Sequence, residues 1–232
     1  MSESVVITGA NRGIGLKLAQ SYIDEGSRVY AGCRKPEMAN ELAHLAENSS
    51  GLLSVHPLDV TNESQRNAFA GMLNDVAIDV LINNAGVYPH KGKSFGQLDA
   101  ESWLTALDVN TVAPMMMAQT LLPNVAASKR KLVASITSKM GSIADNNSGG
   151  SYAYRSTKTA LNMAMKSLAI DLYDQGVSVI LLHPGWVQTD MGGSQALVTP
   201  EQSIKKLRAT LDRAGLPESG TFFDLDGSVI PW

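Results

Sequence analysis

The sequence predicts an α/β fold in which a parallel β-sheet of about seven strands is covered by helices on both faces. Short runs of β-branched and other apolar residues recur along the chain, and stretches of helical length with mixed faces separate them. Strands that alternate with helices are joined by crossover connections, which make neighbouring strands parallel. Because no linker, repeat or low-complexity segment interrupts the alternation, we expect residues 1–232 to form one domain.

The predicted strands are Val5–Thr8, Arg28–Gly32, Leu52–Val55, Ile78–Ile82, Lys131–Ile136, Val177–His183 and Thr221–Leu225. The predicted helices between them include Gly13–Glu25, Asn62–Asn74, Glu101–Ala126, Tyr152–Asp174 and Pro200–Ala214. Two loops rich in turn-forming residues, Asp145–Gly150 and Gly185–Pro200, each come after a strand. Open α/β sheets hold their ligands beyond the carboxyl ends of the strands, so these loops are expected to border a site.

Composition and charge exclude several functional classes. The 19 basic and 22 acidic residues leave a net charge of −3, and no block of one sign is long enough to attract nucleic acid. The single cysteine, Cys33, cannot form an internal disulfide, which favours a reducing cytoplasm. No apolar run approaches the roughly 18 residues of a membrane span, and no secretory segment is expected. The 4 histidines lack the spacing of metal ligands, so no metal site is predicted.

A glycine-rich turn follows the first predicted strand and opens the first predicted helix. It reads Thr8-Gly9-Ala10-Asn11-Arg12-Gly13-Ile14-Gly15. Glycine lets the backbone approach a phosphate closely, while the free amides and the dipole at a helix N-terminus stabilise the phosphate charge. A turn without a ligand is the alternative, and its position between strand and helix favours the phosphate-binding interpretation.

This turn resembles that of the short-chain dehydrogenase/reductase family, whose motif is T-G-x-x-x-G-x-G. The resemblance implies a single Rossmann-type domain that both binds a dinucleotide and carries the catalytic residues. It assigns the cofactor to Gly9, Asn11, Arg12, Gly13, Ile14 and Gly15 in the turn, to Asp59 and Val60 beside the adenine, and to Asn83, Ala85 and Gly86 along the ribose. A helix cap or turn former is the alternative interpretation of Asp59.

The end of the second strand indicates the type of dinucleotide. NAD sites usually place a carboxylate there to bind the ribose 2′-hydroxyl, whereas a 2′-phosphate calls for arginine. Here the strand is followed by Cys33 and Arg34, without a carboxylate, and Arg12 offers a second guanidinium. We therefore expect NADP(H), and an NAD-dependent alcohol oxidation is the less favoured alternative.

A tyrosine and a lysine at helical spacing form the candidate catalytic pair. Tyr154 and Lys158 are four residues apart and hence on one face of the predicted helix. Reduction of a carbonyl requires a hydride on carbon and a proton on oxygen, which a phenol can donate. An ammonium nearby, helped by an oxidised nicotinamide, is expected to lower the pKa of the phenol. Tyr152 lies six residues from Lys158 and points elsewhere.

The resemblance supplies the other members of the site. Ser138 matches the serine that binds the substrate oxygen, with Ser135 and Ser142 as alternatives, and Asn110 matches the asparagine that holds a water for proton transfer. The loop after the sixth strand matches the nicotinamide side of the cofactor site at Pro184, Gly185, Val187 and Thr189. Trp186 and Met191, in the same loop, are candidates for contact with the substrate.

Several motifs narrow the resemblance to the C-factor and Sniffer branch of carbonyl reductases. They are Tyr-Ala-Tyr-Arg-Ser-Thr-Lys, the run that starts at His183-Pro184-Gly185, and the segment around Asp224 to Gly227. The expected function is NADPH-dependent reduction of a small or medium aldehyde or ketone, reversible in principle. A dinucleotide-binding signalling or regulatory protein with slow or incidental reduction is the alternative. By resemblance we also expect a homo-oligomer.

Overall fold

A seven-stranded parallel sheet lies at the centre of the computed structural model, which describes residues 2–232. The strand order is β3-β2-β1-β4-β5-β6-β7, and every adjacent pair of strands is parallel. The strands are β1 (Ser4–Thr8), β2 (Arg28–Cys33), β3 (Leu53–Pro57), β4 (Val80–Asn83), β5 (Leu132–Ile136), β6 (Ser178–Leu182) and β7 (Phe222–Phe223). This confirms the predicted α/β fold with helices on both faces, and the order reverses direction between β1 and β4, where doubly wound sheets hold dinucleotides.

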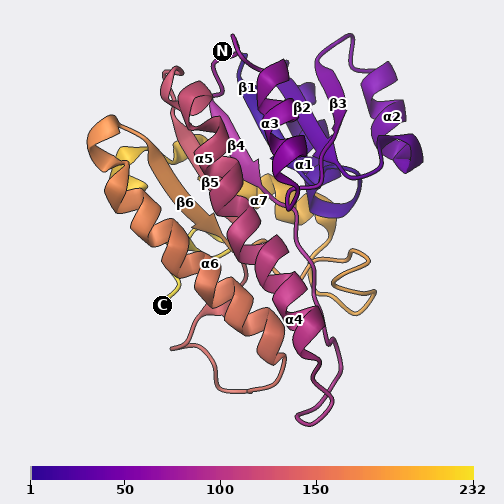
Figure 1. Ribbon diagram of the computed structural model, residues 1–232, viewed down its shortest axis with the longest axis vertical. Coiled ribbons are helices and arrows are strands. Elements are labelled where there is room, and N and C mark those ends of the chain that lie inside the picture. The colour runs from indigo at the N-terminus through magenta and orange to yellow at the C-terminus, as the bar shows by residue number, and fades with distance from the viewer. Residues whose placement is uncertain (1) are drawn as a thin grey trace.

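Seven α-helices connect the strands (Figure 1). They are α1 (Gly13–Asp24), α2 (Asn40–Glu47), α3 (Glu63–Met72), α4 (Ala100–Leu107), α5 (Ala113–Ala126), α6 (Tyr152–Asp171) and α7 (Pro200–Arg213). Helix α2 was not among the predicted helices; it is short and buries only Leu42. The single helix expected over 101–126 is wrong in one respect, because a π-helical turn at Asp108–Val112 separates α4 from α5.

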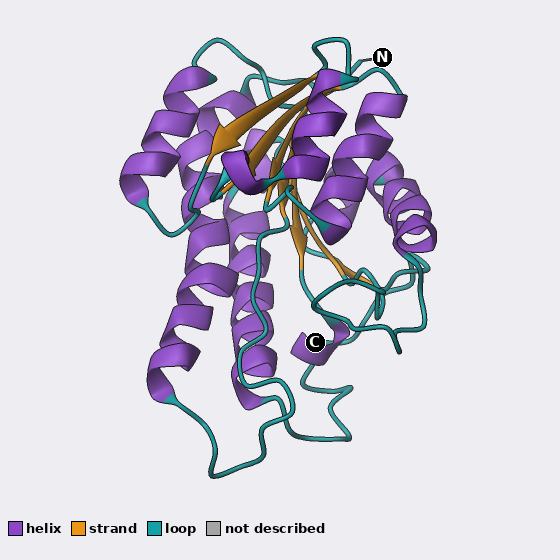
Figure 2. Ribbon diagram, turned by 90° about the vertical axis from the view of Figure 1, so that its right-hand side faces the viewer, coloured by secondary structure: helices purple, strands orange, loops and turns teal. Residues whose placement is uncertain are grey.

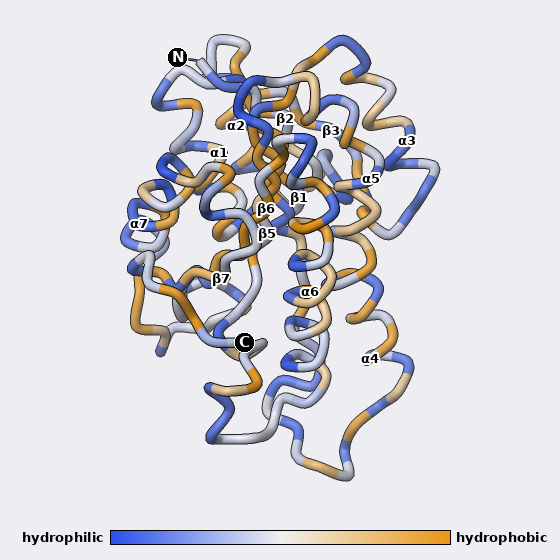
Figure 3. Tube along the Cα trace, turned by 90° about the vertical axis from the view of Figure 1, so that its left-hand side faces the viewer, coloured by the Kyte–Doolittle hydropathy of each residue, from blue (hydrophilic) through white to orange (hydrophobic). Residues whose placement is uncertain are grey.

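Two apolar cores lie on opposite faces of the sheet. The side chains of β1 alternate, so that Val5 and Ile7 pack on the side of α1, α2 and α7, while Val6 packs on the side of α3, α5 and α6. In Figure 3 the strands run through the middle of the molecule as mostly hydrophobic segments. Burial on both faces explains why the strands have near-continuous apolar sequences rather than alternating ones.

Helix α4 and the first turns of α6 extend past the carboxyl ends of the strands (Figure 2). Trp103 of α4 donates a hydrogen bond from Nε1 to Oγ of Ser156 on α6, over 2.9 Å, and so ties the two projecting segments together. The loops after β4, β5 and β6 gather at this end, which we call the C-terminal edge. The beginnings of the strands form the opposite, N-terminal edge.

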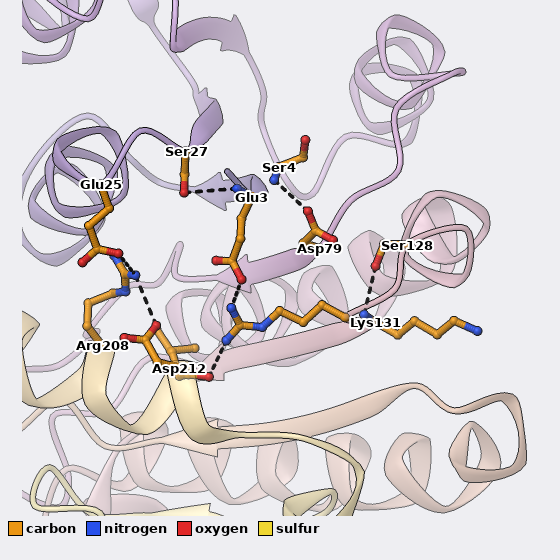
Figure 4. A network of polar contacts seen from close by, with 11 residues as sticks. Glu3, Ser4, Glu25, Ser27, Asp79, Ser128, Lys131, Arg208 and Asp212 are labelled. Atoms are coloured by element: carbon orange, nitrogen blue, oxygen red, sulfur yellow. Dashed lines mark hydrogen bonds and ion pairs between the residues drawn. The ribbon is translucent and has the colours of Figure 1, made fainter. Parts of the chain in front are cut away.

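Ion pairs join the helices and strands at the N-terminal edge (Figure 4). Arg208 of α7 pairs with Glu25 over 2.6 Å and with Asp212 over 3.2 Å, and its guanidinium lies 3.7 Å from the ring centroid of Tyr22. Arg130, just before β5, pairs with Glu3 and donates a second hydrogen bond to the carbonyl of Leu211 over 2.5 Å. Arg208 and Arg130 therefore both have acceptors within the chain.

Within residues 2–232, no helix is both long and apolar enough to span a membrane. The same residues contain no cluster of His, Cys, Asp and Glu that could bind a metal ion.

Candidate active site

The glycine-rich turn after β1 has a backbone that only glycine adopts readily. Gly9 and Gly13 have positive φ values of 65° and 55°, in the left-handed region that disfavours side chains. Gly15 has ordinary backbone angles, yet a Cβ atom there would lie 2.5 Å from both Nδ2 of Asn84 and the carbonyl oxygen of Gly9. The turn is thus packed tightly against the loop after β4.

The first turn of α1 has free amides at the end of this turn. Its N-cap residue, Arg12, is extended and makes no side-chain capping bond, and no acidic residue lies in the first helical turn. An uncapped helix N-terminus next to small residues suits a pyrophosphate, because the amides and the helix dipole both favour an anion. The local geometry therefore fits a dinucleotide here.

Asn84 joins β4 to β1 through hydrogen bonds to the start of the glycine-rich turn. Its Nδ2 donates to the carbonyl oxygens of Thr8 and Gly9 over 2.9 and 3.0 Å, and its backbone amide donates to Oγ1 of Thr8 over 3.0 Å. The neighbouring Ala85 amide donates to the same hydroxyl over 3.1 Å. These bonds hold residues 83–86 beside the glycine-rich turn.

The other predicted cofactor residues lie along the same edge. Arg34 is exposed directly after β2, and Asp59 follows the adjacent strand β3, where its Oδ1 accepts from the amide and hydroxyl of Thr61 over 3.0 and 2.7 Å. After β6, the carbonyl of Pro184 accepts from Ser203 of α7 over 2.7 Å, and Thr189 approaches Gly13. The structure thus brings to one edge the predicted set from β1, β2, β3, β4 and β6.

Arg12, which is predicted to contact the cofactor, lines the cleft and makes an exposed ion pair. Its guanidinium pairs with Asp190 over 2.6 Å, which links the glycine-rich turn to the loop after β6. Asp190 had no role in the sequence analysis, because no local pattern connects two residues that are this far apart in the chain.

The candidate catalytic residues Tyr154, Lys158 and Ser138 lie together at the C-terminal edge. Tyr154 and Lys158 are buried, with exposed fractions of 8% and 4%, and Nζ of Lys158 lies 5.9 Å from the ring centroid of Tyr154. Nζ donates to the carbonyl of Ile136 over 2.9 Å. Ser138 caps the 3₁₀ turn after β5, where its Oγ accepts from the amide of Met140 over 3.2 Å, and its hydroxyl acts to lower the pKa of the Tyr154 phenol.

The two alternative serines occupy other positions. Ser142 donates to the carbonyl oxygen of Pro231 over 2.6 Å and so contacts the C-terminal segment. Ser135 is fully buried within β5, and its hydroxyl has no partner among the described residues.

Asn110 lies in the π-helical turn and holds the loop after β4. Its Oδ1 accepts from the amide of Val87, and its Nδ2 donates to the carbonyl of the same residue, each over 2.8 Å. Nδ2 also donates to Oγ1 of Thr157 over 3.0 Å, and that hydroxyl in turn donates to the carbonyl of Tyr154 over 2.9 Å. Thr157, which was not a predicted site residue, therefore links Asn110 to the backbone of Tyr154.

Burial shifts the pKa values of both members of the candidate catalytic pair. Desolvation raises the pKa of Tyr154 to about 12, although the hydrogen bond from Ser138 partly opposes this effect. Desolvation likewise lowers the pKa of Lys158 to about 8. The expected lowering of the Tyr154 pKa by the ammonium is therefore wrong for the protein chain alone, because burial disfavours the phenolate and Lys158 binds a backbone carbonyl.

A cleft of about 250 Å³ opens between the loops after β4 and β6. Its lining residues are Arg12, Gly86, Val87, Tyr88, Lys91, Asp190 and Met191. Lys91 donates to the carbonyl of Met191 across it, over 2.7 Å. Of the two predicted substrate contacts, Met191 lines the cleft, whereas Trp186 is half exposed and donates from Nε1 to the carbonyl of Gly192 over 2.9 Å.

The chain is similar to a well-populated group of known proteins. Residues 3–197 match the family model described as short chain dehydrogenase. The chain is 41% identical over 165 residues to the C-signal of Myxococcus xanthus, covering 71% of this chain and 99% of that protein. It is 32% identical over 236 residues to 1-hydroxy-2-glutathionyl-2-methyl-3-butene dehydrogenase of Rhodococcus sp. (strain AD45), covering 99% of both.

Solved structures of carbonyl reductases are also similar to this chain. The carbonyl reductase Sniffer of D. melanogaster has a TM-score of 0.94 at 35% identity and covers 100% of both chains. The NADPH-bound carbonyl reductase from chicken fatty liver has a TM-score of 0.93 at 31% identity, covering 100% of this chain and 99% of that one.

Proposed function

The chain belongs to the short-chain dehydrogenase family, and from this premise we propose that it uses NADPH to reduce the carbonyl group of small or medium aldehydes and ketones. The observation that carries the proposal is the buried group of Tyr154, Lys158 and Ser138 beside an open cleft, at the edge where the glycine-rich turn lies. When bound, the cofactor supplies the hydride.

Tyr154 is the proton donor in this proposal. A phenol with a pKa of about 12 keeps its proton at neutral pH, which is the state that reduction requires. Ser138 influences the pKa of the phenol, and its hydroxyl can donate a hydrogen bond to the substrate oxygen, on which negative charge develops. The two hydroxyls therefore converge on the oxygen of the carbonyl group.

Lys158 and Asn110 support the donor. With its pKa lowered to about 8, the ammonium is still charged at neutral pH and favours the phenolate that remains after proton transfer. Asn110 holds the backbone of Val87 on both sides and contacts Thr157, so it keeps the loop after β4 at a set distance from α6. We propose that it also positions a water that returns the proton.

The cofactor is assigned to the predicted residues at this edge. Gly9, Asn11, Gly13, Ile14 and Gly15 would surround the pyrophosphate, because the turn has free amides and no space for a Cβ at Gly15. Arg34, exposed after β2 with no carboxylate at the end of that strand, would bind the 2′-phosphate of NADPH. Support for NADPH also comes from the chicken liver carbonyl reductase, which binds it.

A purely regulatory role is the less favoured alternative. A protein that only binds a dinucleotide has no need of a tyrosine, a lysine and a serine brought together from α6 and from the loop after β5. The high similarity to carbonyl reductases also favours catalysis.

The test is NADPH consumption with a panel of aldehydes and ketones by the wild type, Tyr154→Phe and Tyr152→Phe. Loss of the phenol should lower kcat by about 10²–10⁴-fold, the usual contribution of a general acid. Tyr152 is the matched control, because its ring packs against Phe95 and lies 39% exposed. Equal turnover by Tyr154→Phe and the wild type would exclude the proposed proton donor.

We also infer a homo-oligomer in the cytoplasm. The large apolar residues Leu104, Met163 and Ile170 are exposed on α4 and α6, and symmetric assemblies bury such surfaces. Sedimentation of the purified protein would test the oligomeric state.

A further inference from the structure

Tyr88 is an aromatic residue in the cleft that the proposed mechanism does not use. It follows Val87, whose amide and carbonyl are both hydrogen-bonded to the side chain of Asn110 over 2.8 Å. These two hydrogen bonds fix the backbone just before Tyr88. The position of the Tyr88 ring is therefore set by the same residue that holds the candidate catalytic elements together.

The ring of Tyr88 lies flat against the ring of Tyr154. The two centroids are 4.1 Å apart and the planes differ by 17°, so Tyr88 covers one face of the candidate proton donor. The hydroxyl of Tyr88 is 2.7 Å from Oγ of Ser151 and 4.0 Å from Sδ of Met140. The far end of the ring is thus held by the loop that follows β5.

Ser151 is unusual in its own right. It is the N-cap residue of α6, yet its side chain makes no capping bond, although serine is among the strongest helix caps. Its φ of 48° lies in the left-handed region, which a serine rarely adopts. Its hydroxyl bonds to Tyr88 instead, so the local structure favours a fixed Tyr88 over an ordinary cap.

We propose that Tyr88 is a specificity-determining residue of this site: its ring forms the wall that limits the size of the group carried beside the substrate carbonyl. The cleft is lined by Tyr88 on the side of β4 and by Met191 on the side of β6, and its volume is only about 250 Å³. Tyr88 both lines the cleft and stacks on Tyr154, so its ring lies between the cleft and one face of the proposed donor. Removal of the ring opens space directly beside the donor.

The inference rests on the proposed reductase function, and a pair of aldehydes tests it. Benzaldehyde and 2-naphthaldehyde share the reacting group and differ by one fused ring. Tyr88→Ala should raise the ratio of kcat/KM for 2-naphthaldehyde over benzaldehyde by about tenfold or more, as expected when a steric limit is removed from an apolar pocket. Tyr88→Phe keeps the ring and should change the ratio less than about threefold.

Two controls keep the test decisive. Tyr152→Ala removes a nearby aromatic ring that contacts Phe95, and should leave the ratio unchanged. If Tyr88→Ala does not fold, as judged by thermal unfolding and NADPH binding, Tyr88→Leu replaces it and should shift the ratio in the same direction.

The outcomes separate this inference from the function on which it rests. Turnover by the Tyr88 variants with an unchanged ratio overturns the inference and leaves the reductase function standing. A wild type that binds NADPH but reduces neither aldehyde overturns both.

Discussion

Buried cations at the two edges of the sheet differ in their partners. At the N-terminal edge Arg208, whose side chain is 7% exposed, pairs with Glu25 and Asp212. At the C-terminal edge Lys158 is as deeply buried, but among the described residues its ammonium contacts a backbone carbonyl and no carboxylate. Burial accordingly lowers the pKa of Lys158 to about 8, whereas nearby acidic groups keep the pKa of Arg208 high despite its burial.

This difference separates groups that stabilise the fold from groups that are available for chemistry. A buried charge without a counter-ion destabilises the folded state, and such charges persist where function needs them. Substitutions of buried cations at the N-terminal edge should therefore lower the stability of the fold, whereas substitutions at the C-terminal edge should lower the enzymatic activity.

The largest expected effect is on turnover at the C-terminal edge. Lys158→Met should lower kcat by about 10²–10⁴-fold, because the phenolate of Tyr154 loses the ammonium that lies 5.9 Å from its ring centroid. The same substitution should raise the free energy of unfolding at pH 7 by about 1–3 kcal/mol, because it removes an unpaired buried charge. Steady-state kinetics and urea unfolding measure the two effects, with Lys166→Met on the same helix as the control. A variant that loses both activity and stability would contradict the comparison.

The second effect is a dependence of stability on pH. The pKa of Lys158 is lowered from 10.5 to about 8 by burial, so between these values the unfolded chain binds a proton that the folded chain has lost. The contribution of Lys158 to the free energy of unfolding therefore stays at its lowest value below pH 8. It increases as the pH rises to 10.5, by up to about 3 kcal/mol. The measurement is the difference in unfolding free energy between the wild type and Lys158→Met across this range. A difference that does not vary with pH would show that the ammonium is not desolvated.

The third effect lies at the N-terminal edge. Arg208→Leu should lower the free energy of unfolding by about 2 kcal/mol, because it removes two ion pairs and the contact with Tyr22, although the exposed carboxylates can be solvated. The kcat per folded molecule should stay unchanged. Lys205→Leu, an exposed cation on the same helix, is the control and should have little effect. A loss of kcat in Arg208→Leu at full folding would mean that the two edges are coupled.

The smallest expected effect is on the affinity for NADPH, and two arginines at opposite ends of one strand test it. Arg34 follows β2 at the C-terminal edge, and Arg28 begins the same strand at the N-terminal edge. Arg34→Ala should raise the Kd for NADPH about tenfold, as for the loss of one charge-assisted hydrogen bond, and leave the Kd for NADH unchanged. Arg28→Ala should alter neither. Tryptophan fluorescence during cofactor titration gives both constants, and equal changes for NADPH and NADH would remove Arg34 from the phosphate site.

Local patterns were sufficient for most of the elements of this fold. The apolar runs located all seven strands to within a few residues, and the glycine spacing placed the turn that precedes α1. Helix α2 was not predicted, because it buries a single residue and its apolar periodicity is therefore weak. The π-helical turn was not predicted either, since the residue pattern from Asp108 to Val112 does not differ from that of an α-helix.

What the sequence alone determined about this protein is the fold class, the family resemblance and the identity of the candidate catalytic residues, because each depends on neighbours within one turn or one strand. The tertiary structure alone decided the direction in which the pKa of Tyr154 is shifted, the pairing of Arg12 with Asp190 and the stacking of Tyr88 on Tyr154. Desolvation and contact between distant segments exist only after the chain has folded, so no local pattern could have reported them.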